Sequence, residues 1–211
     1  MSAKTSDTES FAARAVKIAI DQWSFFGKQT YDLNGAMDHE GHKEGEEGFY
    51  QRIGQYWVEG TNIHGVNGRN DKWYWSATFI SWVMKQAGAG LRFRYSTQHS
   101  VFISQGIRDF LQNRVEAGYW TRRLNEVKPE VGDIVCWARE KGIDYDNQKQ
   151  GNYAGHSDLI VSVEDKQIWV IGGNVGNSVT KRPLPLDKGY VLAKKYGKEY
   201  LFAIMKNRIN T

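Results

Sequence analysis

The stretch Trp75–Gly88, WSATFISWVMKQAG, decides the fold, because its composition predicts a helix with apolar side chains on nearly every face. A helix without a polar face must be packed on all sides, so we expect it at the centre of the domain. Further helices are predicted around it. Apolar residues recur at three- and four-residue steps from Phe11 to Phe26, with a cap at Thr8 or Ser10 and an end at Gly27.

Two more helices complete the first half. One runs from Glu46 to Gly60, after a glycine-rich loop over residues 29–45, and the other follows a cap at Ser100. After about residue 117 the period changes to short runs rich in Val, Ile and aromatic residues, which predict strands at 131–137, 157–163, 167–171 and 200–205. Helices followed by an antiparallel sheet indicate an α+β domain. We expect one domain over residues 1–211, with a core at 46–208 and an N-terminal extension at 1–45.

Composition and charge narrow the class of protein. The formal net charge of +4 is spread along the 211 residues, so no stripe for nucleic acid is indicated. Cys136 is the only cysteine, which excludes an internal disulfide and a cysteine zinc site. There is no run of 18 apolar residues, so we expect no membrane-spanning helix. No apolar signal core follows the polar start, so export would use a route without a cleaved signal peptide.

Three residues are candidates for catalysis. Ser76 begins the central helix, where the helix dipole and unpaired N–H groups stabilise a developing anion, although serine is also a common N-cap. His156 begins a strand and is a candidate general base, or a histidine bonded to a neighbour on an edge strand. Asn174 ends the next strand and is a candidate to orient the imidazole, or an ordinary turn residue.

The order of these motifs resembles the NlpC/P60 and CHAP amidase-peptidase superfamily, which has a papain-like fold. Trp75–Val83 is similar to its nucleophile helix, and Val131–Val135 to its Pro-Gly-Asp strand. Gly155-His156 resembles the catalytic-histidine strand, and Ile171–Asn174 with Asn177–Val179 the segment of the third residue. A bacterial branch with Trp-Ser-Ala at the nucleophile is closer, and it also resembles Tyr95–Ser100. The resemblance covers roughly residues 45–205.

The resemblance implies a hydrolase that cuts amide bonds in peptidoglycan stem peptides, with Ser76, His156 and Asn174 as its catalytic residues. The chain is also similar to wall-degrading effectors of type VI secretion, which lack signal peptides. This implies an antibacterial toxin that acts in the target-cell periplasm, with a secretion-system carrier and an immunity protein as partners. No cofactor, metal or nucleic acid is expected.

The chain departs from the superfamily at the nucleophile, where serine replaces cysteine. A cysteine acts as a thiolate beside an imidazolium, whereas Ser76 needs a base to remove its proton during attack. Three outcomes are compatible with this change: an amidase or peptidase, an esterase or lipase, and a wall-binding relic without turnover.

Other residues near the motifs have alternative roles. Asp158 shares a sheet face with His156 and is a second candidate to orient it. His99 is a candidate cleft residue. The three aromatic residues Trp73, Tyr74 and Trp75 are candidates for substrate binding, or for the core. Cys136 is expected to be a small buried thiol. The loop around His39 and His42 lacks the HExxH spacing, so no metal site is expected there.

Overall fold

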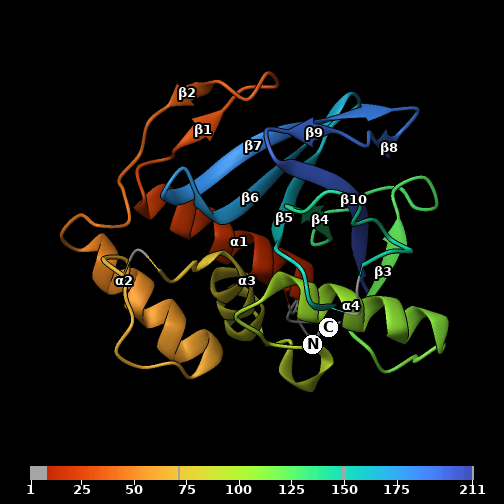
Figure 1. Ribbon diagram of the computed structural model, residues 1–211, viewed down its shortest axis with the longest axis horizontal. Coiled ribbons are helices and arrows are strands. Elements are labelled where there is room, and N and C mark those ends of the chain that lie inside the picture. The colour runs from red at the N-terminus through yellow and green to blue at the C-terminus, as the bar shows by residue number, and fades with distance from the viewer. Residues whose placement is uncertain (1–8, 71, 149–150, 211) are drawn as a thin grey trace, which may run out of the picture.

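The computed structural model describes residues 9–70, 72–148 and 151–210 (Figure 1). Its helices are α1 (Phe11–Phe25), α2 (Phe49–Gln55), α3 (Ser76–Gln86) and α4 (His99–Leu111), with a π-helical turn at Tyr56–Gly60 and a 3-10 turn at Gly90–Arg92. The strands are β1 (Thr30–Tyr31), β2 (Met37–His39), β3 (Tyr119–Arg123), β4 (Ile134–Ala138), β5 (Gly155–Val163), β6 (Gln167–Val175), β7 (Ser178–Asp187), β8 (Tyr190–Val191), β9 (Lys195–Tyr196) and β10 (Glu199–Asn207). The expected α+β class, with N-terminal helices and a largely antiparallel C-terminal sheet, is confirmed.

Helix α3 lies at the centre of the fold, as its all-round apolar pattern predicts. Every residue from Ser76 to Met84 is buried, and α3 contacts α1, the π-helical turn, β5 and β6. The π-helical turn approaches it closely at Gly60, where a Cβ atom would lie 3.0 Å from the Thr78 carbonyl oxygen. This distance is tighter than most Cβ contacts, so the missing side chain of Gly60 lets the backbone of the turn pack closely on α3.

The strands form one sheet in the order β2-β1-β7-β6-β5-β4-β10-β3. Neighbouring strands are antiparallel, apart from the single pairing of Thr30 in β1 with Lys181 in β7. The sequence did not indicate β7, because Pro183 and Pro185 are atypical of a strand interior. Both prolines pair with β6. On its other side, β7 pairs with β1 before the prolines, at Lys181, and with β8 after them, from Leu186.

The two faces of the sheet carry two apolar clusters. Ile134 and Cys136 of β4 belong to the cluster shared with α1, α3 and α4, whereas Val135 and Trp137 belong to the cluster on the other face. This alternation follows from the two-residue period of a strand. Because both faces are covered, β4 is buried throughout, which explains its continuous apolar run.

Several local expectations are tested by the structure. The Ser10 cap is confirmed, since its hydroxyl accepts a hydrogen bond from the Ala13 N–H at 3.2 Å, and Thr8 lies outside the described residues. The Ser100 cap is wrong, because α4 begins at His99 after Gln98. The loop over 29–45 contains the short hairpin β1-β2. Within the described residues, no helix is long and apolar enough to cross a membrane.

Candidate active site

Ser76 is the first residue of α3, and its side chain is 3% exposed. The preceding residue, Trp75, makes no side-chain cap on this helix end. Trp75 is instead packed in the core against Phe26, Tyr56 and Phe79, and its indole N–H donates to Glu44 at 2.6 Å. Its expected contact with substrate is therefore corrected: Trp75 fixes the start of α3 from inside the protein.

The Ser76 hydroxyl forms its hydrogen bond with His99. Ser76 Oγ lies 2.7 Å from His99 Nε2, and His99 is the first residue of α4. Two helices therefore begin at the same place and bring a hydroxyl to an imidazole. The sequence predicted His156 as the partner of Ser76 and His99 only as a cleft residue. In the structure, His99 is the residue that forms the hydrogen bond with Ser76.

The pleat of β5 explains why His156 is not the partner of Ser76. His156 pairs with Trp137 of β4, and directly paired residues share a sheet face. Trp137 belongs to the cluster on the face away from the helices, whereas Phe79 of α3 belongs to the other cluster. His156 therefore points away from α3. The His99 and His156 rings still approach each other, with centroids 5.1 Å apart.

His156 is oriented by Asp158. Its Nε2 lies 2.9 Å from Asp158 Oδ1, while Nδ1 has no partner among the described residues. Asn174 lies at the end of β6 with a φ of 56°, a left-handed conformation that asparagine tolerates well. No recorded hydrogen bond among the described residues joins Asn174 to His156, so its orienting role stays a prediction, whereas Asp158 does hold the imidazole.

A buried ion network extends from Asp158. Its Oδ2 accepts hydrogen bonds from Arg182 Nη2 at 2.7 Å and from Trp137 Nε1 at 2.8 Å. Burial alone would raise the pKa of the Asp158 carboxyl, but the charge of Arg182 and the bond to His156 outweigh burial and hold this pKa well below its usual range. Asp158 therefore stays ionised, and its three partners fix its position.

The network returns to the surface through two further residues. Arg182 Nη1 lies 3.3 Å from Glu199 Oε2, and Glu199 Oε1 accepts from Arg139 Nε at 2.7 Å. None of these three residues was a candidate from the sequence alone. The position of Arg139 could have suggested it, because this charged residue directly follows the apolar run Ile134–Ala138. Arg182 and Glu199 come from β7 and β10, and no local pattern places them beside His156.

A cleft of about 570 Å³ opens beside the hydroxyl. Ser76, His99 and Arg139 line it, together with Tyr74 and the segment around Tyr153. Tyr74 is 71% exposed, so it lies at the surface and not in the core, and its predicted contact with substrate stays a prediction. Trp73 is half-exposed and packs edge-on against Trp57, with centroids 5.7 Å apart. His156 is fully buried, so His99 is the histidine that faces the cleft.

The surroundings of His99 keep its ring neutral. Burial lowers the pKa of His99 well below its ordinary value of 6.5, and the nearby charges of His156 and Arg139 lower it further, against a smaller opposing effect of Asp158. In a neutral ring that accepts a proton at Nε2, the hydrogen sits on Nδ1. A neutral His99 can thus accept the hydrogen bond of the Ser76 hydroxyl at Nε2.

The only cysteine and the histidine-containing loop are not part of this site. Cys136 lies fully buried in β4, and burial raises the pKa of its thiol far above that of a reactive cysteine. His42 stacks on Phe49 and bonds to Glu46 at 2.7 Å. Among the described residues, no group of three or more His, Cys, Asp or Glu side chains is arranged to hold a metal ion.

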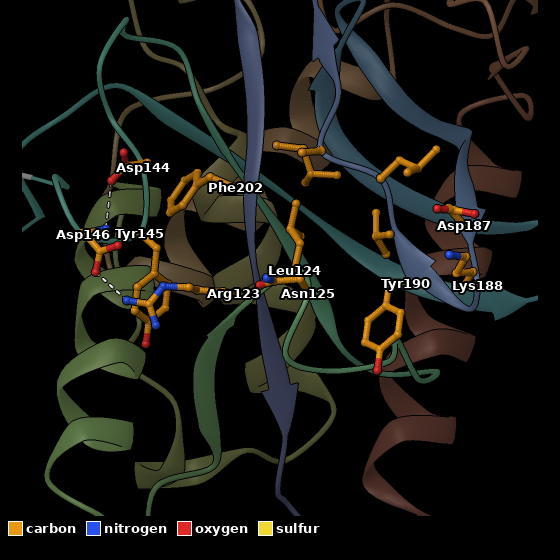
Figure 2. A pocket seen from close by; sticks show the side chains of 14 residues that line it. Arg123, Leu124, Asn125, Asp144, Tyr145, Asp146, Asp187, Lys188, Tyr190 and Phe202 are labelled. Carbon is orange, nitrogen blue, oxygen red and sulfur yellow. Dashed lines mark hydrogen bonds and ion pairs between the residues drawn. The ribbon is translucent and has the colours of Figure 1, made fainter.

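A larger hollow of about 840 Å³ lies elsewhere, between the β7-β8 hairpin and β10 (Figure 2). Tyr190 and Phe202 point into it, and Arg123 and Asp146 form an ion pair of 2.5 Å at its edge. None of the residues of the Ser76–His99 site lines it. Its volume exceeds that of the cleft, but its described lining residues include no serine, threonine, cysteine or histidine.

Comparison with known proteins gives a family. Residues 44–204 match the model of a family described as uncharacterized protein conserved in bacteria (DUF2272). No curated protein and no solved structure matches the chain. The matched residues include α3, the start of α4, and strands β4 to β7, so they contain Ser76, His99, His156 and Asp158. The chain therefore belongs to the DUF2272 family of bacterial proteins.

Proposed function

We propose that this chain is a serine hydrolase that cuts amide bonds in the stem peptides of peptidoglycan. The observation that carries the proposal is the 2.7 Å hydrogen bond between Ser76 Oγ and His99 Nε2 at the wall of a cleft. This distance is within the range in which a histidine activates a hydroxyl nucleophile. Ser76 is the proposed nucleophile, as expected from the sequence, and His99 is the proposed general base in place of His156.

The first chemical step follows from this geometry. His99 Nε2 takes the proton of the Ser76 hydroxyl while Oγ forms a bond to the substrate carbonyl carbon, and the carbonyl electrons move to its oxygen. The N–H groups of the first turn of α3 lie beside Ser76 and have no side-chain cap. They are therefore available to bind this oxyanion, and the positive end of the helix dipole adds to the stabilisation.

The second step releases both halves of the substrate. The protonated His99 gives its proton to the leaving amine as the C–N bond breaks, which leaves an acyl-Ser76 ester. Water then attacks this ester, with His99 again as base, and Ser76 regains its proton. His156 and Asp158 act from behind His99: their buried charge and fixed geometry help to hold the ring near Ser76, with ring centroids 5.1 Å apart.

The choice of peptidoglycan rests on the resemblance to the NlpC/P60 and CHAP superfamily and on the bacterial family of the chain. The same resemblance supports a role as an effector that a secretion system delivers to the periplasm of a target bacterium. Directing the chain to the periplasm of a laboratory bacterium tests this role. We expect lysis with the native chain and normal growth with Ser76→Ala or with cytoplasmic expression.

The activity itself is tested with purified sacculi. We expect the native chain to release muropeptides that mass spectrometry identifies by the peptide bond cut, and Ser76→Ala to release none. A fluorophosphonate probe should label the native protein at Ser76. Full release of muropeptides by Ser76→Ala would exclude the nucleophile. Hydrolysis of nitrophenyl esters with intact sacculi would replace the amidase with an esterase, and binding to sacculi without any product would indicate a wall-binding module.

A further inference from the structure

We infer that the cleft beside Ser76 contains a carboxylate subsite, in which Arg139 binds a free carboxylate group of the substrate. This inference rests on the proposed function and deepens it, because it names a chemical feature that the substrate must carry near the bond that is cut. It starts from the residues that line the cleft. Among the described lining residues, Arg139 is the only lysine or arginine.

The Arg139 side chain is held in place by the protein. It directly follows β4, and its backbone N–H donates to the Ala154 carbonyl at 2.8 Å. Its Nε and Nη2 both lie 2.7 Å from the same oxygen, Glu199 Oε1, and Glu199 is itself fixed by Arg182. The guanidinium is therefore preorganised, which reduces the entropy lost when a ligand binds.

The guanidinium also keeps donors for a ligand. The described contacts of Arg139 with Glu199 use Nε and Nη2, and none uses Nη1. The side chain is one-third exposed, so this end reaches the cleft. Arginine binds a carboxylate through charge-assisted hydrogen bonds from its planar fork, which makes a carboxylate the group that best fits these donors.

Two helix ends add positive potential to the same cleft. Ser76 begins α3 and His99 begins α4, helices of 11 and 13 residues, and neither has a side-chain cap. The N-terminus of a helix attracts anions through its dipole and its unpaired N–H groups. In addition, His99 lines the cleft while only 5% exposed, and its Nδ1 has no partner among the described residues.

One carboxylate side chain also lines the cleft. Glu140 Oε1 accepts a hydrogen bond from the Ala154 N–H at 2.6 Å, so it is tied to the backbone of the cleft wall. The recorded ion pair of Arg139 is formed with Glu199. A substrate carboxylate would thus meet Arg139 and two positive helix ends. Stem peptides carry such free carboxylates, which agrees with the proposed substrate.

The test measures binding separately from hydrolysis. Full-length Ser76→Ala protein is titrated by calorimetry with a synthetic stem tetrapeptide whose carboxyl groups are free, and with the same peptide converted to carboxamides. We expect the free acid to bind about tenfold more tightly or better, as for the gain of a charge-assisted hydrogen bond. Adding Arg139→Gln should remove this preference, and Arg139→Lys should keep part of it, because lysine has the charge without the fork.

The matched control is Arg94→Gln, an exposed arginine that lines a different hollow, and it should leave the preference unchanged. Circular dichroism melting checks that each variant is folded. The inference is overturned if Arg139→Gln keeps the preference, if Ser76→Ala shows none, or if neither peptide binds. Digestion of sacculi by the native chain distinguishes the two proposals. If sacculi are digested but Arg139→Gln still prefers the free-acid peptide, only the carboxylate subsite is excluded. If the preference for the free acid depends on Arg139 but sacculi are not digested, only the proposed function is excluded.

Discussion

Ser76 and His99 each occupy the first position of a helix, which restricts their backbones and fixes where their side chains begin. The hydroxyl and the imidazole meet at 2.7 Å because α3 and α4 start side by side, although 23 residues separate the two positions in the chain. His156 lies behind His99 and outside the cleft. In the proposed reaction, His99 is therefore the group that would exchange a proton with Ser76.

Replacing His99 with alanine should lower the rate of muropeptide release by about 10²- to 10⁴-fold, the usual contribution of a general base. The rate is measured from initial release by sacculi, with the fold checked by circular dichroism. His64→Ala is the control, because His64 is exposed and contacts only Asn62 among its recorded hydrogen bonds. A fully active His99→Ala together with an inactive, folded His156→Ala would transfer the role of base to His156.

The pH dependence should reflect the lowered pKa of His99. A base with a lowered pKa stays unprotonated at lower pH, so the acid limb of kcat/KM should have its midpoint below 6.5, the ordinary pKa of a histidine. Stability has the matching sign. Below about pH 6.5 the unfolded chain binds a proton that the buried ring does not, so the free energy of unfolding should fall as the pH drops. An acid limb centred above pH 6.5 would contradict the assignment.

At the scale of elements, Gly172 in β6 allows the strands to share one ion network. Arg182 in β7 must cross β6 to reach Asp158 in β5, and Gly172 lies on the sheet face that carries both. A Cβ atom at this position would lie 1.9 Å from Asp158 Oδ1 and 3.1 Å from His156 Nε2. The missing side chain is therefore what makes room for the His156–Asp158 pair.

Gly172→Ala should accordingly destabilise the protein by about 1–3 kcal/mol, the usual cost of overpacking a core. The measurement is urea unfolding followed by tryptophan fluorescence. Gly45→Ala provides the matched control, because nothing lies within 4 Å of a Cβ atom there and its φ is not positive. Equal stability of the two variants would show that the strands shift to accommodate the methyl group, and that the packing around Asp158 is looser than the structure indicates.

At the scale of the whole molecule, the N-terminal segment is part of the core. Phe11 and Phe26 are fully buried, and α1 contacts α3, β5, β6 and β7 (Figure 1). From the sequence, residues 1–45 are expected to be an extension of a core at 46–208. The contacts of α1 give this segment a second role, because it covers one side of α3 and part of the sheet.

Deleting residues 1–45 should therefore prevent stable folding. Each of the two phenylalanine side chains contributes about 1.5–3 kcal/mol by burial, and their loss also uncovers the apolar residues beneath them. The check is soluble expression and a cooperative thermal transition, compared with a chain that lacks only residues 1–8. A shortened chain that melts cooperatively near the temperature of the full chain would show that the core is complete without α1.

The class of the fold and much of its local structure could be predicted from the amino-acid sequence. The apolar pattern of residues 75–88 placed α3 in the centre, and the change of period after residue 117 indicated the sheet, because burial imposes a periodicity that can be read from one chain. Ser76 was identified for the same reason, since it starts the most buried helix. The prolines of β7 concealed that strand, because the rule against proline holds for strands paired along their whole length.

The groups that meet Ser76 could not be predicted in this way, because they depend on how distant segments pack. The face on which a strand residue points depends on the register with its neighbours, and the pairing of His156 with Trp137 turned this histidine away from α3. His99, Arg139, Arg182 and Glu199 come from four separate elements or loops, and no spacing in the chain encodes their distances. Local periodicity follows from the burial of each segment, whereas the geometry of the site follows from how the segments pack against one another.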